Sequence, residues 1–262
     1  MNFEFKKSLG QNFLTDKNIL ENIVKVANIE PNSLVIEVGP GSGNLTKYIA
    51  KYATNVLCYE IDTRLEEILS ENLYKYNNID IVFDDFLNRN IKEDIKKYTY
   101  DNLYLVSNLP YYITTPIIEK VITSDLLFKQ ITIMIQKEVG ERFNAKPKTK
   151  EYNSLTVYLN YYFDIKQEFI VSRNAFIPKP NVDSVIISLK SKENKLYLKD
   201  KVLFNKLLRD SFKYKRKTIK NNLKNYNLDI IEKTLQKYGY SLTTRAEELS
   251  LEVFVDLSNK LS

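Results

Sequence analysis

The residues best suited to chemistry lie at the ends of apolar, strand-like runs. The segment EVGPGSGNLT, residues 37–46, follows the first such run and contains Gly39, Gly41 and Gly43. Glycine lets a backbone turn tightly and approach a ligand closely, as the loops of nucleotide-binding folds require. The spacing is G-x-G-x-G, which differs from the G-x-G-x-x-G of dinucleotide-binding proteins.

Acidic residues end the next two strand-like runs. Glu60 ends the second run, seventeen residues beyond Gly43, where its carboxylate can accept hydrogen bonds from both hydroxyls of a ribose. Asp85 follows the third run and is expected to face the same crevice, because ligands of open α/β sheets bind outside the carboxyl ends of the strands. Three such strand ends predict a cofactor that carries adenosine. The alternative is a set of tight turns with solvated acids.

The fourth strand-like run ends in NLPYYIT, residues 108–114. A turn needs only the Asn and the Pro, whereas adjacent aromatic rings suggest stacking on a flat ligand. If the cofactor is S-adenosylmethionine and the ligand is a base, the Asn108 oxygen and the carbonyl of Leu109 or Pro110 can accept both N–H bonds of adenine N6. Tyr111 can stack on the extracted base. Alone, NLPY is equally typical of a plain strand-to-turn connection.

The composition excludes several kinds of catalysis. The chain has no histidine, so Ser-His-Asp and Cys-His nucleophile systems, histidine metal sites and histidine proton shuttles are impossible. Its single cysteine, Cys58, excludes disulfides and cysteine-rich zinc sites, and no metal site is expected. Methylation of an amine fits these limits, because the methylated amine is acidic and loses its proton without a strong base.

The chain has the composition of a folded globular protein. It has 262 residues, of which 44% are hydrophobic and 27% are charged. No apolar run reaches the roughly 18 residues of a membrane span, and the first ten residues have no signal-peptide apolar core. These features indicate the cytosol or the matrix of an organelle, and we expect a cytoplasmic protein with no membrane partner.

Alternating strand and helix patterns predict the framework that positions these residues. Strands are expected at residues 33–38, 55–61, 79–83, 103–109 and 130–136, and helices at 15–29, 44–53 and 63–76. This alternation indicates a doubly wound, mostly parallel sheet. Two further strands, 164–172 and 182–190, are joined by too short a link for a crossover helix and are expected to pair antiparallel. We predict a catalytic domain over 1–190 and a small all-helical domain over 191–262.

Positive charge gathers in the predicted helical domain. The chain has a net charge of +6, and residues 213–224 contain six cations and no acid. On a helix, one face would carry Lys213, Arg216 or Lys217, Lys220 and Lys224, opposite Leu208, Phe212, Ile219 and Leu223. This face is expected to bind RNA phosphates, although a merely solvated helix face is the alternative. Lys146, Lys148 and Lys150 form a second basic segment.

Six motifs together resemble those of the ribosomal RNA adenine N6,N6-dimethyltransferases. They are LGQNFL (9–14), EVGPGSGNLT (37–46), NLPY (108–111), FIPKPNVDS (176–184), FKYKRKTIKNNL (212–223) and RAEELSLEVF (245–254). They run in order along nearly the whole chain. The resemblance implies a class I methyltransferase, Rossmann-like sheet with an antiparallel last strand and a small C-terminal all-helical domain. It is greatest to the bacterial branch that dimethylates two adjacent adenosines near the 3′ end of 16S rRNA.

The resemblance also implies roles for individual residues. The S-adenosylmethionine-binding positions of the family correspond to Asn12, Leu14, Gly39, Glu60, Asp85 and Asn108. Asn108, Pro110 and Tyr111 would form the target-adenine site, and Phe176 would lie against the adenine. The partner implied is 16S rRNA within the small ribosomal subunit or its precursor, bound by Lys213, Arg216, Lys217 and Lys220 of a monomer.

Some residues depart from the family pattern or bear on the substrate. Asp84 stands where family members commonly have Gly, which affects the expected cofactor-adenine contact, and Tyr112 stands where a polar residue is common. A sibling family methylates 23S rRNA and confers macrolide resistance. Leu109, Leu9-Gly10, Asp183 and the RAEELSLEVF ending favour the small-subunit branch.

Two other functional classes stay open at this point. One is a mainly non-catalytic ribosome-assembly factor on the same scaffold, although the intact NLPY and glycine loop favour an enzyme. The other is a nicotinamide-dependent oxidoreductase, which the G-x-G-x-G spacing disfavours.

Overall fold

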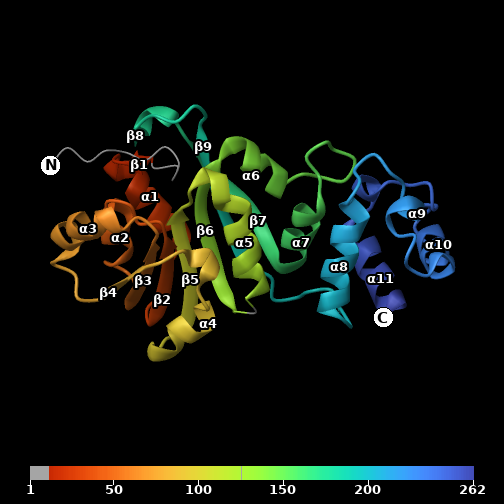
Figure 1. The fold of residues 1–262 in the computed structure, drawn as a ribbon, viewed down its shortest axis with the longest axis horizontal. Coiled ribbons are helices and arrows are strands. Elements are labelled where there is room, and N and C mark those ends of the chain that lie inside the picture. The colour runs from red at the N-terminus through yellow and green to blue at the C-terminus, as the bar shows by residue number, and fades with distance from the viewer. Residues whose placement is uncertain (1–11, 125) are drawn as a thin grey trace. The chain divides into compact units, whose positions relative to one another are not determined.

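The computed structural model describes residues 12–124 and 126–262 and is drawn in Figure 1. Its contacts group the chain into two compact units. The first comprises Met1–Gly140 and Lys166–Ser191, and the second comprises Glu141–Ile165 and Lys192–Ser262. The last change of unit falls after Ser191, one residue beyond the boundary predicted after residue 190. The contacts also assign Glu141–Ile165 to the second unit, which the sequence-based boundary did not.

A seven-stranded sheet forms the framework of the first unit. Its strands are β2 (Ser33–Val38), β3 (Asn55–Glu60), β4 (Ile79–Phe83), β5 (Asn102–Asn108), β6 (Phe128–Gln136), β7 (Phe163–Val171) and β9 (Ser184–Ser191). Their order is β4-β3-β2-β5-β6-β9-β7. The strands from β4 to β6 pair parallel, and β9 pairs antiparallel with β6. The predicted class I methyltransferase, Rossmann-like fold is confirmed.

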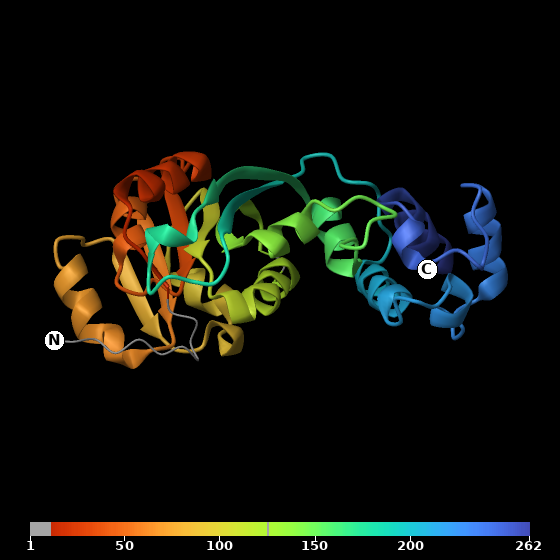
Figure 2. The ribbon, with the colours of Figure 1, turned by 90° about the horizontal axis from the view of Figure 1, so that it is seen from above.

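Helices cover both faces of this sheet. They are α1 (Lys17–Ala27), α2 (Asn44–Ile49), α3 (Glu66–Leu73), α4 (Ile91–Asp94), α5 (Thr114–Thr123) and α6 (Lys137–Phe143). Helix α1 begins at the cap Asp16, whose side chain accepts hydrogen bonds from the Asn18 and Ile19 amides, and ends at left-handed Asn28. Helix α5 lies on the opposite side of the sheet from α1 (Figures 1 and 2). All six residues of β2 are buried, as expected for a central parallel strand.

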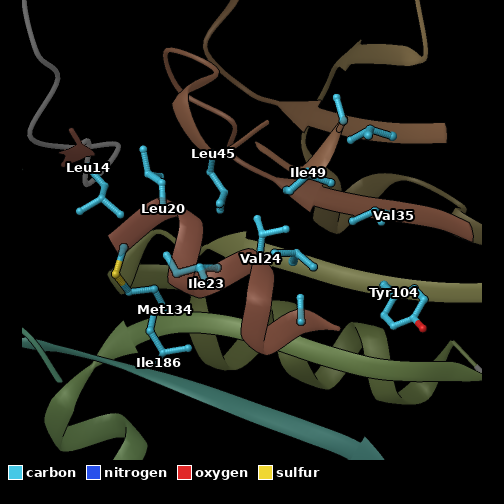
Figure 3. Packing of buried hydrophobic residues seen from close by; sticks show 14 of the residues in the cluster. Leu14, Leu20, Ile23, Val24, Val35, Leu45, Ile49, Tyr104, Met134 and Ile186 are labelled. Carbon is cyan, nitrogen blue, oxygen red and sulfur yellow. The ribbon is translucent and has the colours of Figure 1, made fainter. Parts of the chain in front are cut away.

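The main core of this unit lies between α1, α2 and the sheet. Figure 3 shows Leu20, Ile23 and Val24 of α1 beside Met134 of β6 and Ile186 of β9. Each of these side chains is at most 4% exposed. Burial of this size, about 1.5–3 kcal/mol for each large apolar side chain, holds the carboxyl ends of the strands in place.

Two short strands form a second, two-stranded sheet. Strand β1 (Phe13–Leu14) pairs antiparallel with β8 (Phe176–Ile177), with Leu14 opposite Phe176. The side chains of Leu14 and Phe176 are both buried in the main core. This pairing joins segments that lie more than 160 residues apart in the sequence.

The second unit is helical. Its helices are α7 (Ser154–Tyr162), α8 (Lys201–Phe212), α9 (Ile219–Asn222), α10 (Leu228–Gln236) and α11 (Leu251–Leu261). Buried residues at helical spacing form its own core, among them Phe204 and Leu207 of α8, Ile231 and Leu235 of α10, and Phe254 of α11. The predicted all-helical C-terminal region is therefore confirmed.

The prediction of a single helix over the basic residues 213–224 is wrong. Helix α8 ends at Phe212, residues 213–217 form bends and turns, Thr218 forms an isolated β-bridge with Arg245, and α9 contains only Ile219–Asn222. A continuous helix would place like charges four residues apart, which is destabilising. Instead, the side-chain amide nitrogen of Asn222 donates hydrogen bonds to the carbonyls of Ser211 at 2.7 Å and Tyr214 at 3.2 Å, which holds the chain in a turn.

Candidate active site

An open cleft lies in the first unit where β2, β3, β4 and β5 end, and its space together with the adjoining solvent is about 950 Å³. It is lined by the glycine loop, by the acid that ends β3, by the acids that follow β4, by the NLPY segment and by residues of β1. The lining residues predicted from the sequence are Asn12, Leu14, Gly39, Gly41, Glu60, Asp85, Asn108, Pro110 and Tyr111. The structure thus gathers nine predicted residues from five separate segments.

The glycine loop abuts both the NLPY segment and β1. Gly39 and Gly41 have φ values of +72° and +60°, which L side chains rarely adopt. A Cβ at Gly39 would lie 3.5 Å from Pro110, and a Cβ at Gly41 would lie 2.5 Å from the Phe13 ring. Glycine is therefore required at position 41 by both conformation and space.

Gly43 has a different surrounding from the other two glycines. It precedes α2 with a φ of +76°, and a Cβ there would meet Leu69 and Leu73 of α3 at 3.1–3.2 Å. It is not among the residues that line the cleft. The structure therefore places Gly43 at the contact between the loop and α3.

Glu60 is a buried carboxylate on the wall of the cleft, 5% exposed. One oxygen accepts a hydrogen bond from the Gly41 amide at 3.1 Å, and the other accepts one from the Asp62 amide at 2.9 Å. Burial raises its pKa, and these backbone hydrogen bonds oppose the rise. Each oxygen still has a lone pair for a further donor such as a ribose hydroxyl.

Glu37 is a cleft residue to which the sequence-based prediction gave no role. It lies on β2, is 1% exposed and accepts a weak hydrogen bond from the Cys58 thiol at 3.7 Å. Burial raises its pKa to about 8, so the carboxyl is mostly protonated at neutral pH. Its place at the start of the EVGPG motif was the available signal.

The electrostatic character of the cleft is acidic. Glu60, Asp84 and Asp85 line it beside the mostly protonated Glu37, whereas none of its described lining residues is Lys or Arg. Asp85 is half-buried and caps the following turn by accepting a hydrogen bond from the Leu87 amide at 2.9 Å. A cleft of this kind favours a cationic ligand over an anionic one.

The NLPY segment is held in place on both sides. The Asn108 amide nitrogen donates to the Asn12 carbonyl at 3.2 Å, which leaves its side-chain oxygen available to a ligand. The Pro110 carbonyl already accepts hydrogen bonds from the Ile113 amide and the Thr114 hydroxyl, each at 3.2 Å. This occupation favours Leu109 over Pro110 as the second acceptor for an amine.

Tyr111 is tied to the sheet by Ser184 at the start of β9. The two hydroxyls lie 2.6 Å apart, and Ser184 is fully buried. Burial raises the pKa of the Tyr111 phenol. The ring therefore has a fixed position beside the cleft, whereas its neighbour Tyr112 is 51% exposed.

The N-terminal motif and the FIPKP segment meet through the β1–β8 pair. The Asn44 side chain donates to the Leu14 carbonyl at 3.0 Å, which joins β1 to the glycine loop. Phe176 is 3% exposed in the main core and does not line the cleft, so its contact with a target adenine stays a prediction. Leu9, Gly10 and Gln11 of LGQNFL lie outside the described residues.

The predicted RNA-binding residues belong to the second unit. Lys213, Arg216, Lys217 and Lys220 are all exposed, with the first three on the turn after α8 and the last on α9. On the opposite side of this segment, Ile219 and Leu223 are buried in the helical core. The basic side chains therefore face solvent although they share no helix.

Comparison with known families identifies the chain's relatives. A family model described as ribosomal RNA adenine dimethylase matches residues 2–262. The chain belongs to this family. Its members are methyltransferases, so the protein needs a methyl donor and a ribosomal RNA substrate.

Individual relatives within and near this family agree. The ribosomal RNA small subunit methyltransferase A of Macrococcus caseolyticus is 43% identical, over 99% of this chain and 90% of the relative. That of Clostridium botulinum is 45% identical, over 98% and 94%. Among solved structures, a dimethyladenosine transferase from Plasmodium falciparum has a TM-score of 0.77 at 27% identity, covering 94% of this chain and 95% of that one. The 23S rRNA methyltransferase ErmE has a TM-score of 0.71 at 27% identity, covering 95% and 99%.

Over residues 12–124 and 126–262, none of the helices combines the length and the apolar character that crossing a bilayer requires.

Proposed function

We propose that this protein transfers methyl groups from S-adenosylmethionine to N6 of two adjacent adenosines near the 3′ end of 16S rRNA. The product is N6,N6-dimethyladenosine in the small ribosomal subunit, and the reaction accompanies assembly of that subunit. The main support is the contact between the glycine loop and the NLPY segment, where Gly39 and Pro110 adjoin within one cleft.

The chemistry of the cleft fits S-adenosylmethionine. The sulfonium and the amino group of this donor are cationic, and the cleft presents Glu60, Asp84 and Asp85 without a lysine or arginine among its described lining. Glu60 offers buried carboxylate oxygens for ribose hydroxyls, and Asn12, Leu14 and Asp85 add side-chain and backbone groups to the same wall. A dinucleotide would bring an anionic diphosphate to these acids, which disfavours an oxidoreductase.

The residues of NLPY are suited to hold an exocyclic amine. S-adenosylmethionine, when bound, supplies an electrophilic methyl group on sulfur. The Asn108 oxygen and the Leu109 carbonyl would accept the two N–H bonds of adenine N6 and fix its direction of attack. Charge develops on N6 as it is alkylated, and these two dipoles stabilise that charge before the proton leaves to solvent.

Aromatic side chains would hold the base itself. Tyr111, fixed by Ser184, presents a rigid ring for stacking on an extracted adenine. Phe176 would supply a second aromatic surface if the β1–β8 pair opened around the RNA. Because every residue in this scheme comes from one chain, a monomer suffices. The proposed location is the cytoplasm, where bacterial ribosomal subunits are assembled.

The RNA would also be bound outside the cleft. Lys213, Arg216, Lys217 and Lys220 present exposed cations that can neutralise phosphates, which makes binding dependent on salt. The small-subunit substrate is supported by relatives of 42–45% identity whose names specify that subunit. The similarity to ErmE, a 23S rRNA methyltransferase, keeps large-subunit rRNA as the second candidate.

Two substrates offered in parallel test the proposal. The purified protein would receive radiolabelled S-adenosylmethionine with either 30S subunits that lack the dimethylation or protein-free 23S rRNA, and mass spectrometry would map the modified sites. We expect dimethyladenosine only in the 3′-terminal region of 16S rRNA. Label in 23S rRNA would reassign the substrate, and label in neither would favour a non-catalytic assembly factor.

A further inference from the structure

Two basic turns that are distant in the sequence lie side by side in the second unit. The first contains Lys146, Lys148 and Lys150, and the second contains Lys213, Lys215, Arg216 and Lys217. The Lys215 ammonium donates a hydrogen bond to the Lys150 carbonyl. Just beyond the turns, the Tyr152 and Phe212 rings pack edge to face with centroids 6.0 Å apart. These seven cations are called the basic surface below.

The charges of the basic surface have no carboxylate in ion-pair contact, although Lys213 is near enough to Asp210 to help lower the pKa of that carboxyl. All seven side chains are exposed, and across the described residues none forms an ion pair with a carboxylate. Other lysines of the unit do form such pairs, as Lys206 does with Asp210 at 2.7 Å. The nearest acid in the sequence is Glu151, which is exposed beside the first turn. The surface therefore has charge available for an anionic partner.

The distribution of charge over the chain agrees with this. The second unit has 20 Lys and Arg against 12 Asp and Glu, a net charge of +8, whereas the first has 19 against 21. The net positive charge of the protein is thus carried entirely by the second unit, which does not contain the cleft. A field of this sign steers polyanions toward this unit.

The backbones of both turns are fixed before any partner binds. The Lys148 amide, at a left-handed φ of +71°, donates to the Glu247 carbonyl at 2.7 Å. In the second turn, the Lys217 amide donates to the Tyr214 carbonyl at 2.9 Å, and the Asn222 side chain bonds both the amide and the carbonyl of Tyr214. Binding would therefore order little additional backbone.

Tyr214 gives the surface a character beyond charge. Its side chain is 57% exposed in the middle of the second turn, and the Lys213 ammonium lies 5.6 Å from its ring centroid. An exposed aromatic ring between phosphate-binding cations is the combination that binds unpaired nucleotides, because a base can stack while its phosphates are neutralised. A membrane surface would require several apolar side chains to insert, and a double helix alone would leave the ring unused.

We propose that the two turns form one RNA-binding surface, in which Lys146, Lys148 and Lys150 bind phosphates and Tyr214 stacks on an unpaired base. This rests on the proposed function, since it concerns how the same RNA substrate is held. To the RNA-binding residues expected from the sequence it adds one kind of contact and five residues, which are Lys146, Lys148, Lys150, Tyr214 and Lys215.

The absence of tryptophan from the chain permits a direct test of stacking. A Tyr214→Trp variant would contain the protein's one tryptophan, and a Tyr197→Trp variant serves as control because Tyr197 is 77% exposed in the same unit. Each would be titrated with single-stranded oligoadenylate of about 16 nucleotides, a length that spans such sites. We expect strong quenching of fluorescence at position 214 and little at position 197. Equal quenching at both positions, or none at 214 while the oligonucleotide binds, would overturn the stacking contact.

Salt dependence tests the role of the first turn. Binding of 30S subunits would be measured over a series of salt concentrations for the triple variant Lys146→Gln, Lys148→Gln, Lys150→Gln. Loss of three phosphate contacts should reduce the slope of log K against log salt by about 2, at about 0.7 for each single-stranded contact. The control carries Lys233→Gln and Lys260→Gln, exposed lysines of α10 and α11.

The results separate this inference from the proposed function. A slope unchanged in the triple variant, in protein that methylates 30S subunits normally, would refute the first turn's role and leave the enzyme assignment intact. A wild-type protein that methylates neither rRNA would refute the assignment instead. Thermal melting of each variant confirms that the exposed substitutions leave the fold unchanged.

Discussion

At the scale of single residues, Asn108 combines two roles that can be separated. Its amide nitrogen is bound to the Asn12 carbonyl at 3.2 Å, while its oxygen is available to accept from adenine N6. We expect Asn108→Ala to lower the rate of methyl transfer by about 10²–10³, the usual loss for one transition-state hydrogen bond. Binding of S-adenosylhomocysteine, measured by calorimetry, should change little.

Asn108→Asp provides a matched comparison, because it keeps the acceptor oxygen and removes the donor to Asn12. Retained turnover in Asn108→Ala would contradict the proposed mechanism. A large loss of cofactor binding in both variants would assign Asn108 to the cofactor instead.

Glu37 makes stability depend on pH through burial. Its pKa is about 8 in the folded protein against 4.5 in the unfolded chain, so the folded state binds the proton more tightly. The stabilisation is complete below pH 4.5 and is lost as the pH rises through 8. Between pH 5 and 8 this one group should reduce the free energy of unfolding by about 3 kcal/mol.

A Glu37→Gln variant removes this titration while keeping the shape of the side chain. Denaturant unfolding at pH 5, 6.5 and 8 should show the variant gaining stability relative to the wild type as the pH increases. A constant difference between the two proteins over this range would show that Glu37 does not titrate there.

At the scale of elements, the glycine loop and β1 depend on each other. Gly41 has a φ of +60°, and a Cβ added there would lie 2.5 Å from the Phe13 ring. Gly239, after α10, has a similar φ of +75°, but a Cβ added there would meet no atom within 4 Å. Alanine at either position should cost about 1–2 kcal/mol for the left-handed backbone. Only Gly41→Ala should also displace β1 and weaken cofactor binding, by tenfold or more.

The comparison is made by thermal melting and by cofactor titration of both variants. If Gly239→Ala weakened cofactor binding as much as Gly41→Ala, the packing of Phe13 on the loop would have no functional role. If neither weakened it, the loop would tolerate a displaced β1.

At the scale of the whole molecule, the two units carry net charges of opposite sign. The first unit has a net charge of −2 and contains the acidic cleft, and the second has a net charge of +8. A cationic cofactor and an anionic RNA would thus be attracted to different parts of the chain. S-adenosylhomocysteine should therefore raise the melting temperature, with about 2.7 kcal/mol of stabilisation at 100 times its Kd, and NAD should not. Equal stabilisation by NAD would reopen the oxidoreductase hypothesis.

Much of the fold follows from local pattern. The five parallel strands and the helical C-terminal region agree with the sequence because periodicity and burial reinforce each other along short segments. The helix expected over 213–224 does not form, because the prediction took account of hydrophobic spacing and left out the other local interactions. Hydrophobic spacing favoured it, but like charges and the side chain of Asn222 favour turns.

Residue types and order alone indicated the chemistry. Four residues lie at the end of a strand or within two residues after it, and strand ends converge at one edge of a parallel sheet; they are Gly39, Glu60, Asp85 and Asn108. Only the tertiary structure could place Phe13 over Gly41, pair β1 with β8, bind Tyr111 to Ser184 and join the two basic turns. Each of these contacts joins segments remote in the sequence. No local pattern encodes them, because the hydrophobic core, rather than any neighbouring residue, decides which distant segments meet.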